Sequence, residues 1–379
     1  MTTLSRRRSR TTEIPQGATY VELFFDLVFV YAVTQVTSLL GHDLTWLGAA
    51  RAAVVAWLVW WAWQQFTWTL SPADTTNPVV EVTVLAAAAM AFFMARSVVD
   101  TFDGNPWLFL VPYLLVRGTG MWLYGWVGGD DRQMGRSMGL FAAASLPAVA
   151  ALMLGAWLDP GARVWVWALA VVLDLGAGFV ARRVEWRIHV SHFAERHALF
   201  VIIALGESLI AVGVASADVE STMAAFLAKA AGVALVCVMW WGYFGWFSRW
   251  LEERIEASPS VDRIRNCYSF MHFPVVAGVI AVAASLEEVV AHPGMPLEPP
   301  AAAALAVGLA LYYGAVAVLA MAAERLLLTW RLVVVGLMVV SAAAGAALDV
   351  DGILVVAVAV LLGVTIALVE RPASRRDRG

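Results

Sequence analysis

The sequence has few charged residues and almost no lysine. Charged side chains make up 14% of the 379 residues, hydrophobic ones make up 61%, and Lys229 is the only lysine among 25 basic residues. The mean hydropathy of +0.76 excludes an ordinary soluble globular domain. Apolar runs of membrane-spanning length occur along nearly the whole chain, so the sequence predicts an all-α polytopic integral membrane protein.

The motifs of several common chemistries are also missing. The sequence contains no GxxxxGK[ST] loop, no GxSxG elbow and no HExxH helix, which argues against ATP-driven transport, serine hydrolysis and metalloprotease chemistry by this chain. Its two cysteines, Cys237 and Cys267, lack a CxxC spacing, and we interpret both as buried thiols.

Histidines close to one another in sequence form no familiar metal-ligand pattern. His189, His192 and His197 lie near Glu195, but a charged, partly amphipathic connector explains this segment better than a metal site. The basic residues are accounted for by membrane topology and not by a nucleic-acid surface. We therefore expect no metal, no cofactor, no catalytic residue assignable from a motif and no nucleic-acid partner.

About twelve transmembrane helices are expected, with boundaries uncertain by several residues. The expected spans are 19–40, 50–70, 78–99, 106–127, 137–158, 163–181, 197–217, 222–247, 268–290, 301–323, 331–348 and 351–369. If residue 1 is cytoplasmic, twenty of the 25 basic residues fall on the cytoplasmic side. The positive-inside rule therefore predicts a multi-pass protein of the cell membrane with both termini in the cytoplasm.

The two halves of the chain resemble each other. At an offset of 181 residues, Leu23–Asp26 falls on Ala204–Glu207, and at an offset of 180 Trp60-Trp61 falls on Trp240-Trp241. A third match, Gly155–Asp159 with Gly345–Asp349, follows in order. We predict two parallel six-helix repeats. The expected organisation is a basic cytoplasmic tail at 1–18, a first repeat at 19–181, a cytoplasmic connector at 182–196, a second repeat at 197–369 and a cytoplasmic tail at 370–379.

Ionisable residues inside the spans are the strongest candidates for function. Glu22 and Asp26 are four residues apart on one helical face, and an acid at the depth of Asp26 costs on the order of 2–3 kcal/mol. Arg117, Asp174 and Glu207 are each expected near mid-membrane. Arg117 is expected to pair with Asp174 or Glu207, either as a structural ion pair or as part of a substrate or proton site.

Two motifs resemble those of a known family. The stretch E-L-F-F-D-L-V-F-V at Glu22–Val30 and the stretch E-R-H-x-L-F-V-I-I-A-L-G-E-S at Glu195–Ser208 are similar to the bacterial low-temperature-requirement A (LtrA) family, and the likeness extends over most of residues 15–370. The resemblance implies an integral membrane protein named for a cold-growth phenotype, and it brings no biochemical activity with it. The positions that match the family's motifs are Glu22, Phe25, Asp26, Glu195, Arg196, Gly206 and Glu207.

Three classes of function remain open at this point. The leading hypothesis is a secondary transporter that works by alternating access in the lipid bilayer, with Asp26 and Glu207 as proton or cation carriers and Arg117 as their counter-charge. Its substrate would be a proton, an ion or a small molecule. A membrane-embedded enzyme, in which intramembrane Asp/Glu pairs and His272 act as acid and base, is an alternative that we do not favour. A structural or sensory bundle is the other. The sequence does not indicate the oligomeric state.

Overall fold

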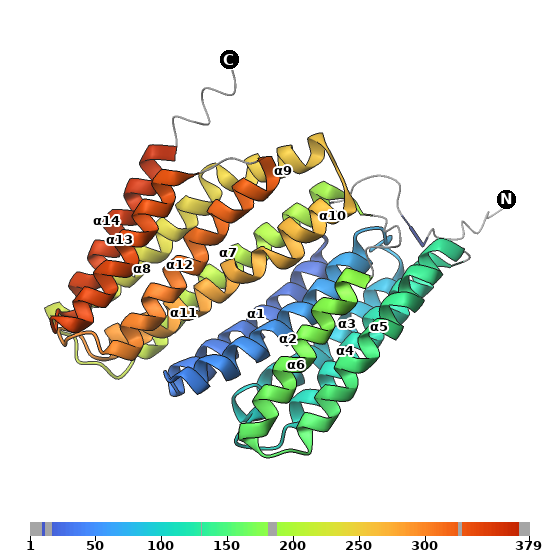
Figure 1. Ribbon diagram of the computed structural model, residues 1–379, viewed down its shortest axis with the longest axis horizontal. Helices are drawn as coiled ribbons and strands as arrows, with labels where there is room; N and C mark the ends of the chain where they lie inside the picture. Colours follow the sequence, from blue (N-terminus) through green and yellow to red (C-terminus); the bar gives the residue numbers. More distant parts are fainter. Residues whose placement is uncertain (1–9, 12–16, 130, 181–187, 325–327, 371–379) are drawn as a thin grey trace, which may run out of the picture. The chain divides into compact units, whose positions relative to one another are not determined.

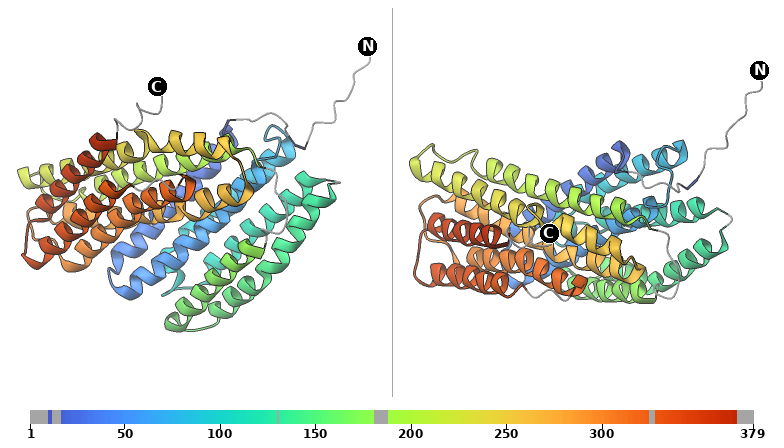
Figure 2. Two further views of the ribbon diagram at one scale, coloured as in Figure 1. Left: turned by 45° about the horizontal axis from the view of Figure 1, so that its top comes forward. Right: turned by 90° about the horizontal axis from the view of Figure 1, so that it is seen from above.

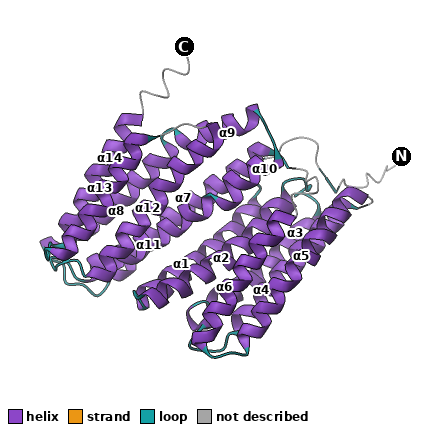
Figure 3. Cartoon of the chain, in the orientation of Figure 1, coloured by secondary structure: helices purple, strands orange, loops and turns teal. Residues whose placement is uncertain are grey.

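The described residues form helices joined by short loops. A computed structural model of the chain describes residues 10–11, 17–129, 131–180, 188–324 and 328–370. Apart from two isolated bridges, the regular structure in these ranges is entirely helical (Figure 3). The predicted all-α class is confirmed.

Twelve of the helices in the described ranges are long, and each corresponds to one predicted span. They are α1 (Tyr20–His42), α2 (Trp46–Leu70), α3 (Pro78–Arg96), α4 (Trp107–Gly128), α5 (Arg132–Ala156), α6 (Pro160–Val180), α7 (Val190–Ala215), α8 (Met223–Phe244), α11 (His272–Ala291), α12 (Pro299–Glu324), α13 (Thr329–Ala347) and α14 (Gly352–Glu370). All of these except α4 are apolar enough over their length to cross a membrane. Arg117, together with the tyrosines and tryptophans of α4, lowers the hydropathy of that helix.

Capping side chains explain where several helices begin. The Asn77 side chain accepts a hydrogen bond from the Val79 amide at the start of α3, where Pro78 occupies the first helical position. Asp131 accepts from the Gln133 and Met134 amides at the start of α5. These polar groups satisfy amides that the helix itself leaves without partners.

The chain divides into two compact units. Unit 1 contains residues 1–32 and 57–196, and unit 2 contains residues 33–56 and 197–379. In unit 1, α3, α4, α5 and α6 pack in chain order, each helix against the next (Figure 1). In unit 2, α11, α12, α13 and α14 also pack in chain order, and α8 packs against α14 (Figure 2). The predicted repeats at 19–181 and 197–369 remain a prediction.

Small residues let two helices of unit 2 approach closely. A Cβ atom added to Gly278 of α11 would lie 2.7 Å from the Gly308 carbonyl oxygen of α12, and one added to Gly308 would lie 2.8 Å from the Val282 amide nitrogen. The two backbones therefore touch here without side chains between them, as is common where helices pack in membranes.

Shorter helices follow α8 in the chain. Helix α9 (Phe247–Ala257) buries Phe247, Leu251 and Ile255 on one face and carries charged residues elsewhere, as helices at a membrane surface do. It is followed by α10 (Val261–Ile264) and by a π-helix, η3 (Arg265–Phe270), which leads into α11.

The prediction of two buried thiols is half correct. Cys267 is buried in η3, whereas Cys237 is exposed on α8. A helix that spans a membrane has an outer face that contacts lipid, and a thiol is apolar enough to lie there. The mean hydropathy of a span does not show whether a given apolar residue faces lipid or packs on a neighbouring helix.

Reporters inserted in the loops test the predicted orientation. Tags at residues 1 and 379 and a reporter within 182–187 should be cytoplasmic, because twenty basic residues would then lie on that side. Reporters at 103–105 and at 293–295 should be external. Residues 1–9, 182–187 and 371–379, which carry much of this charge, lie outside the described part of the chain. An external signal from 182–187 would contradict the predicted topology.

Candidate functional site

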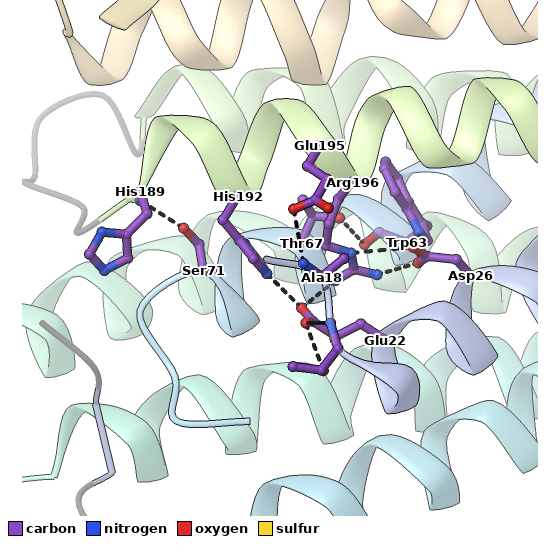
Figure 4. A network of polar contacts seen from close by, with 11 residues as sticks. Ala18, Glu22, Asp26, Trp63, Thr67, Ser71, His189, His192, Glu195 and Arg196 are labelled. Carbon is purple, nitrogen blue, oxygen red and sulfur yellow. Dashed lines mark hydrogen bonds and ion pairs between the residues drawn. The ribbon is translucent and has the colours of Figure 1, made fainter. Parts of the chain in front are cut away.

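Four titratable side chains meet inside unit 1. Glu22 and Asp26 extend from the start of α1, and His192 and Arg196 extend from the start of α7 (Figure 4). Glu22, Asp26 and Arg196 have no exposed surface, and His192 retains 4%. These four residues are called the charge cluster below.

Helical spacing explains why these four side chains face one another. Glu22 and Asp26 are four residues apart, and so are His192 and Arg196. Residues at this spacing lie above one another on one face of a helix. Each helix therefore presents a two-residue polar strip, and the strip of acids on α1 contacts the strip of bases on α7.

One guanidinium group holds both carboxylates. Arg196 contacts Asp26 side-on, with Nε donating to Oδ2 at 3.3 Å and Nη2 donating to Oδ1. Its third nitrogen, Nη1, donates to Oε1 of Glu22 at 3.4 Å. Trp63 of α2 donates from its indole nitrogen to Asp26 Oδ1 at 2.7 Å, and the guanidinium lies 5.6 Å from the centre of a Trp63 ring. The two hydrogen bonds from Arg196, together with the one from Trp63, fix the position of the Asp26 carboxylate.

The imidazole of His192 lies on the other side of Glu22. Its Nε2 atom is 3.0 Å from Glu22 Oε1, while Oε2 of the same carboxylate accepts from the amide and hydroxyl of Thr19 at 3.0 and 2.9 Å. The second ring nitrogen, Nδ1, is buried and has no hydrogen-bond partner among the described residues. It is therefore open to a proton or to a water molecule.

The charges of this cluster do not balance without a proton on it. Two ionised carboxylates face one guanidinium, which leaves a net charge of −1 when the imidazole is neutral. Among the described residues, the other ion pairs in which both partners are buried each join one acid to one base. Arg117 pairs with Asp174, and Arg331 pairs with Glu370. A proton on His192 or on a carboxylate makes the charge cluster neutral, and uncompensated charge inside a membrane protein is expensive.

Arg117 belongs to a separate ion pair. Its Nη1 atom donates to Asp174 Oδ2 at 2.6 Å and to the Tyr113 hydroxyl at 3.0 Å. The sequence left Asp174 and Glu207 open as partners of Arg117, and the structure pairs Arg117 with Asp174. The prediction that Arg117 is the counter-charge of Asp26 is wrong, because Arg196 takes that role. The predicted seventh span began at residue 197, whereas α7 begins at Val190 and carries Arg196 into the buried layer.

The two remaining predicted residues lie elsewhere. Glu195 is exposed, and its Oε2 atom accepts from the Ala18 amide at 2.9 Å (Figure 4). Glu207 lies in unit 2 and accepts from the Thr34 hydroxyl at 3.0 Å. Glu195 therefore fastens the chain just before α1, while the structure gives Glu207 no basic partner among the described residues.

Comparison with known proteins identifies the family of this chain. Residues 17–366 match the bacterial low temperature requirement A protein (LtrA) family. The chain belongs to the LtrA family. An uncharacterized protein of Rhizobium meliloti (strain 1021) is 28% identical to it over 290 residues, which cover 73% of this chain and 70% of the relative. No solved structure matches this LtrA chain.

His272, one of the acid–base groups of the enzyme hypothesis, has both ring nitrogens engaged. Nδ1 lies 2.7 Å from the Cys267 carbonyl oxygen, and Nε2 lies 2.7 Å from the Tyr243 hydroxyl. A carbonyl only accepts, so Nδ1 carries the proton and Nε2 accepts from the tyrosine. The ring is fully buried. This arrangement serves packing in unit 2 of this LtrA protein and leaves no nitrogen for acid–base chemistry.

Sequence reasoning missed three contributors of this LtrA chain. His192 was assigned to a connector, although its i,i+4 spacing to Arg196 mirrors that of Glu22 and Asp26 and was a usable signal. Thr19 and Glu22 form the T-x-x-E pattern that marks the start of a helix. In this pattern the glutamate side chain accepts a hydrogen bond from the backbone amide of the threonine. Trp63 had no signal that separated it from its tryptophan neighbours.

Proposed function

We propose that this LtrA-family membrane protein is a proton-coupled secondary transporter whose charge cluster binds and releases the coupling proton. The observation that carries this proposal is the composition of the cluster. It is a fully buried group of two carboxylates and one guanidinium, joined by an imidazole whose second nitrogen has no partner among the described residues.

The cluster has two states that differ by one proton. With the proton, its charges sum to zero and the site tolerates a closed, dry environment. Without it, the site carries a charge of −1 and gains stability from contact with water. Protonation and water access are therefore coupled, which is the requirement for alternating access driven by a proton gradient.

The members of the cluster have different roles in this proposal. Arg196 and Trp63 hold Asp26 in place, so that carboxylate acts as a fixed negative charge. Glu22 and His192 exchange the proton, because Glu22 also contacts Thr19, the residue just before the start of α1. Thr19 and Ala18 are partly exposed, and Tyr20 next to them is 92% exposed. The helix end gives protons a short path from the site to solvent.

A flux assay with His192→Gln tests the proposal. Purified protein in sealed liposomes with an internal pH dye is given an inward proton gradient and supplied with one solute class at a time. We expect at least one solute to drive proton movement that a protonophore abolishes, and we expect His192→Gln to abolish it as well. His292→Gln is the matched control, because His292 also lies 3.0 Å from an acid, Glu288, but is 61% exposed.

Two results would count against the proposal. A product that forms equally in sealed liposomes and in detergent would indicate catalysis. Proton movement that survives His192→Gln would show that the cluster does not carry the coupling proton.

A further inference from the structure

A small cavity lies in unit 2 between the second half of α1, the second half of α7 and α11. Its volume of about 10 Å³ leaves room for one guest the size of a water molecule. Its polar lining is Thr34, Thr37, Glu207 and Ser208. Apolar side chains, including Val279 and Ala283 of α11, complete the lining.

Glu207 is an acid deep in a span without a basic partner. It lies eight residues before the end of α7, roughly 12 Å along the helix axis. Among the described residues its one polar contact is the Thr34 hydroxyl, at 3.0 Å, and no basic side chain forms an ion pair with it. The other acids discussed above at such depth, Asp26 and Asp174, each contact an arginine. Among the described residues no basic side chain balances the charge of an ionised Glu207, and a bound cation would do so.

The hydroxyl groups around Glu207 offer oxygen lone pairs. Thr37 donates its proton to the Val33 carbonyl at 3.3 Å, and Ser208 donates to the Ala204 carbonyl at 3.3 Å. Both partners are carbonyls of the same helix, so each hydroxyl oxygen can still accept a contact from a guest in the cavity. Every polar side chain in the lining ends in oxygen, and oxygen is the ligand of hard cations.

We propose that Glu207, Thr34, Thr37 and Ser208 bind one sodium ion. A monovalent cation makes the site neutral, whereas a divalent cation would leave a charge of +1 inside the membrane. A potassium ion is larger than the sodium ion and fits this cavity less well. A water molecule alone would fill the space and leave the carboxylate uncompensated. Coupling-ion sites of secondary transporters lie near the bilayer midplane, the depth at which the sequence places Glu207.

This site goes beyond the proton-coupled function proposed above and uses none of the same residues. Its test measures binding in detergent and needs neither a substrate nor a proton gradient. Sodium binding without proton movement would overturn the transport proposal and leave the sodium site standing. Proton movement without sodium binding would do the reverse.

The experiment is binding of radioactive ²²Na⁺ to purified protein, together with the melting temperature in NaCl, KCl or choline chloride at equal ionic strength. We expect one saturable sodium site per chain and a melting temperature that rises with sodium alone. Glu207→Gln and Thr37→Val should each weaken sodium binding by about tenfold or more. Two controls should bind as the wild type does. Glu287→Gln removes another acid of unit 2, and Thr365→Val removes an exposed hydroxyl that donates to its own helix at 2.8 Å.

Three results would overturn the sodium site. One is the absence of saturable binding to the wild type. Another is an equal rise of the melting temperature in all three salts, which would be an effect of ionic strength. The third is wild-type affinity in Glu207→Gln. If Glu207→Gln does not fold, Thr37→Val and Ser208→Ala decide the question, because wild-type affinity in both folded variants also overturns the site.

Discussion

Replacing Arg196 with methionine should remove most of the folded protein from the membrane. The substitution keeps much of the apolar volume of the side chain and removes the one guanidinium that contacts Glu22 and Asp26. Two fully buried carboxylates would then face each other across one helical turn. Loss of one partner from a buried ion pair costs about 3–5 kcal/mol. Fluorescence-detected size-exclusion chromatography measures the folded fraction, with Arg249→Met on the exposed surface as the control.

A rescue separates the loss of charge balance from the loss of packing. Combining Arg196→Met with Glu22→Gln and Asp26→Asn removes both acids along with the base. We expect the triple variant to recover folded protein while remaining inactive in the flux assay. A single Arg196→Met variant that folds as the wild type does would show that the guanidinium does not hold the cluster together.

Asp174→Asn should destabilise the protein by a similar amount, for a different reason. It leaves Arg117 fully buried among neutral partners, the Tyr113 and Ser145 hydroxyls. Here the charges are balanced in the wild type, so no proton has to enter or leave. The double variant Arg117→Met with Asp174→Leu should therefore regain both folded protein and proton movement. Thermal unfolding of each variant and the flux assay measure the two properties.

The two sites should respond differently when both kinds of charge are removed. Neutralising both partners at Arg117 and Asp174 should restore function, whereas neutralising the charge cluster should restore only the fold. A double variant of Arg117 and Asp174 that folds well and moves no protons would contradict a purely structural role for this pair.

The sequence predicted the helices well because membrane spans are long and uniformly apolar. Each of the twelve long helices overlaps a predicted span, and the depth of Asp26 followed from counting residues along α1. Burial of Glu22 and Asp26 was expected because acids within a span need a partner. These features depend only on distance along one helix.

The partners of these acids were harder to predict because they depend on distance between helices. Arg117 was the arginine expected near mid-membrane, so depth favoured it as the partner of Asp174 or Glu207 and as the counter-charge of the proposed carriers, whereas Arg196 was assigned to the connector at 182–196. In the structure α7 begins at Val190, seven residues before the predicted span. That boundary error hid His192 and the pairing of Arg196 with Asp26, although Arg196 itself was named as a motif position. Arg331 and Glu370 form a buried ion pair, whereas the sequence placed Arg331 at the cytoplasmic start of a span and Glu370 in the cytoplasmic tail.

Counting the protons that the purified protein takes up tests the central claim most directly. Weakly buffered protein is stepped from about pH 8 to about pH 5, the range where histidine ordinarily changes charge, and a dye reports the protons bound per chain. We predict that His192→Gln and Asp26→Asn each take up about one proton fewer than the wild type, while Glu195→Gln next to the cluster does not. Asp26→Asn keeps the imidazole and removes only the excess negative charge. Wild-type uptake by Asp26→Asn would contradict the claim that this buried charge cluster is the proton-binding site.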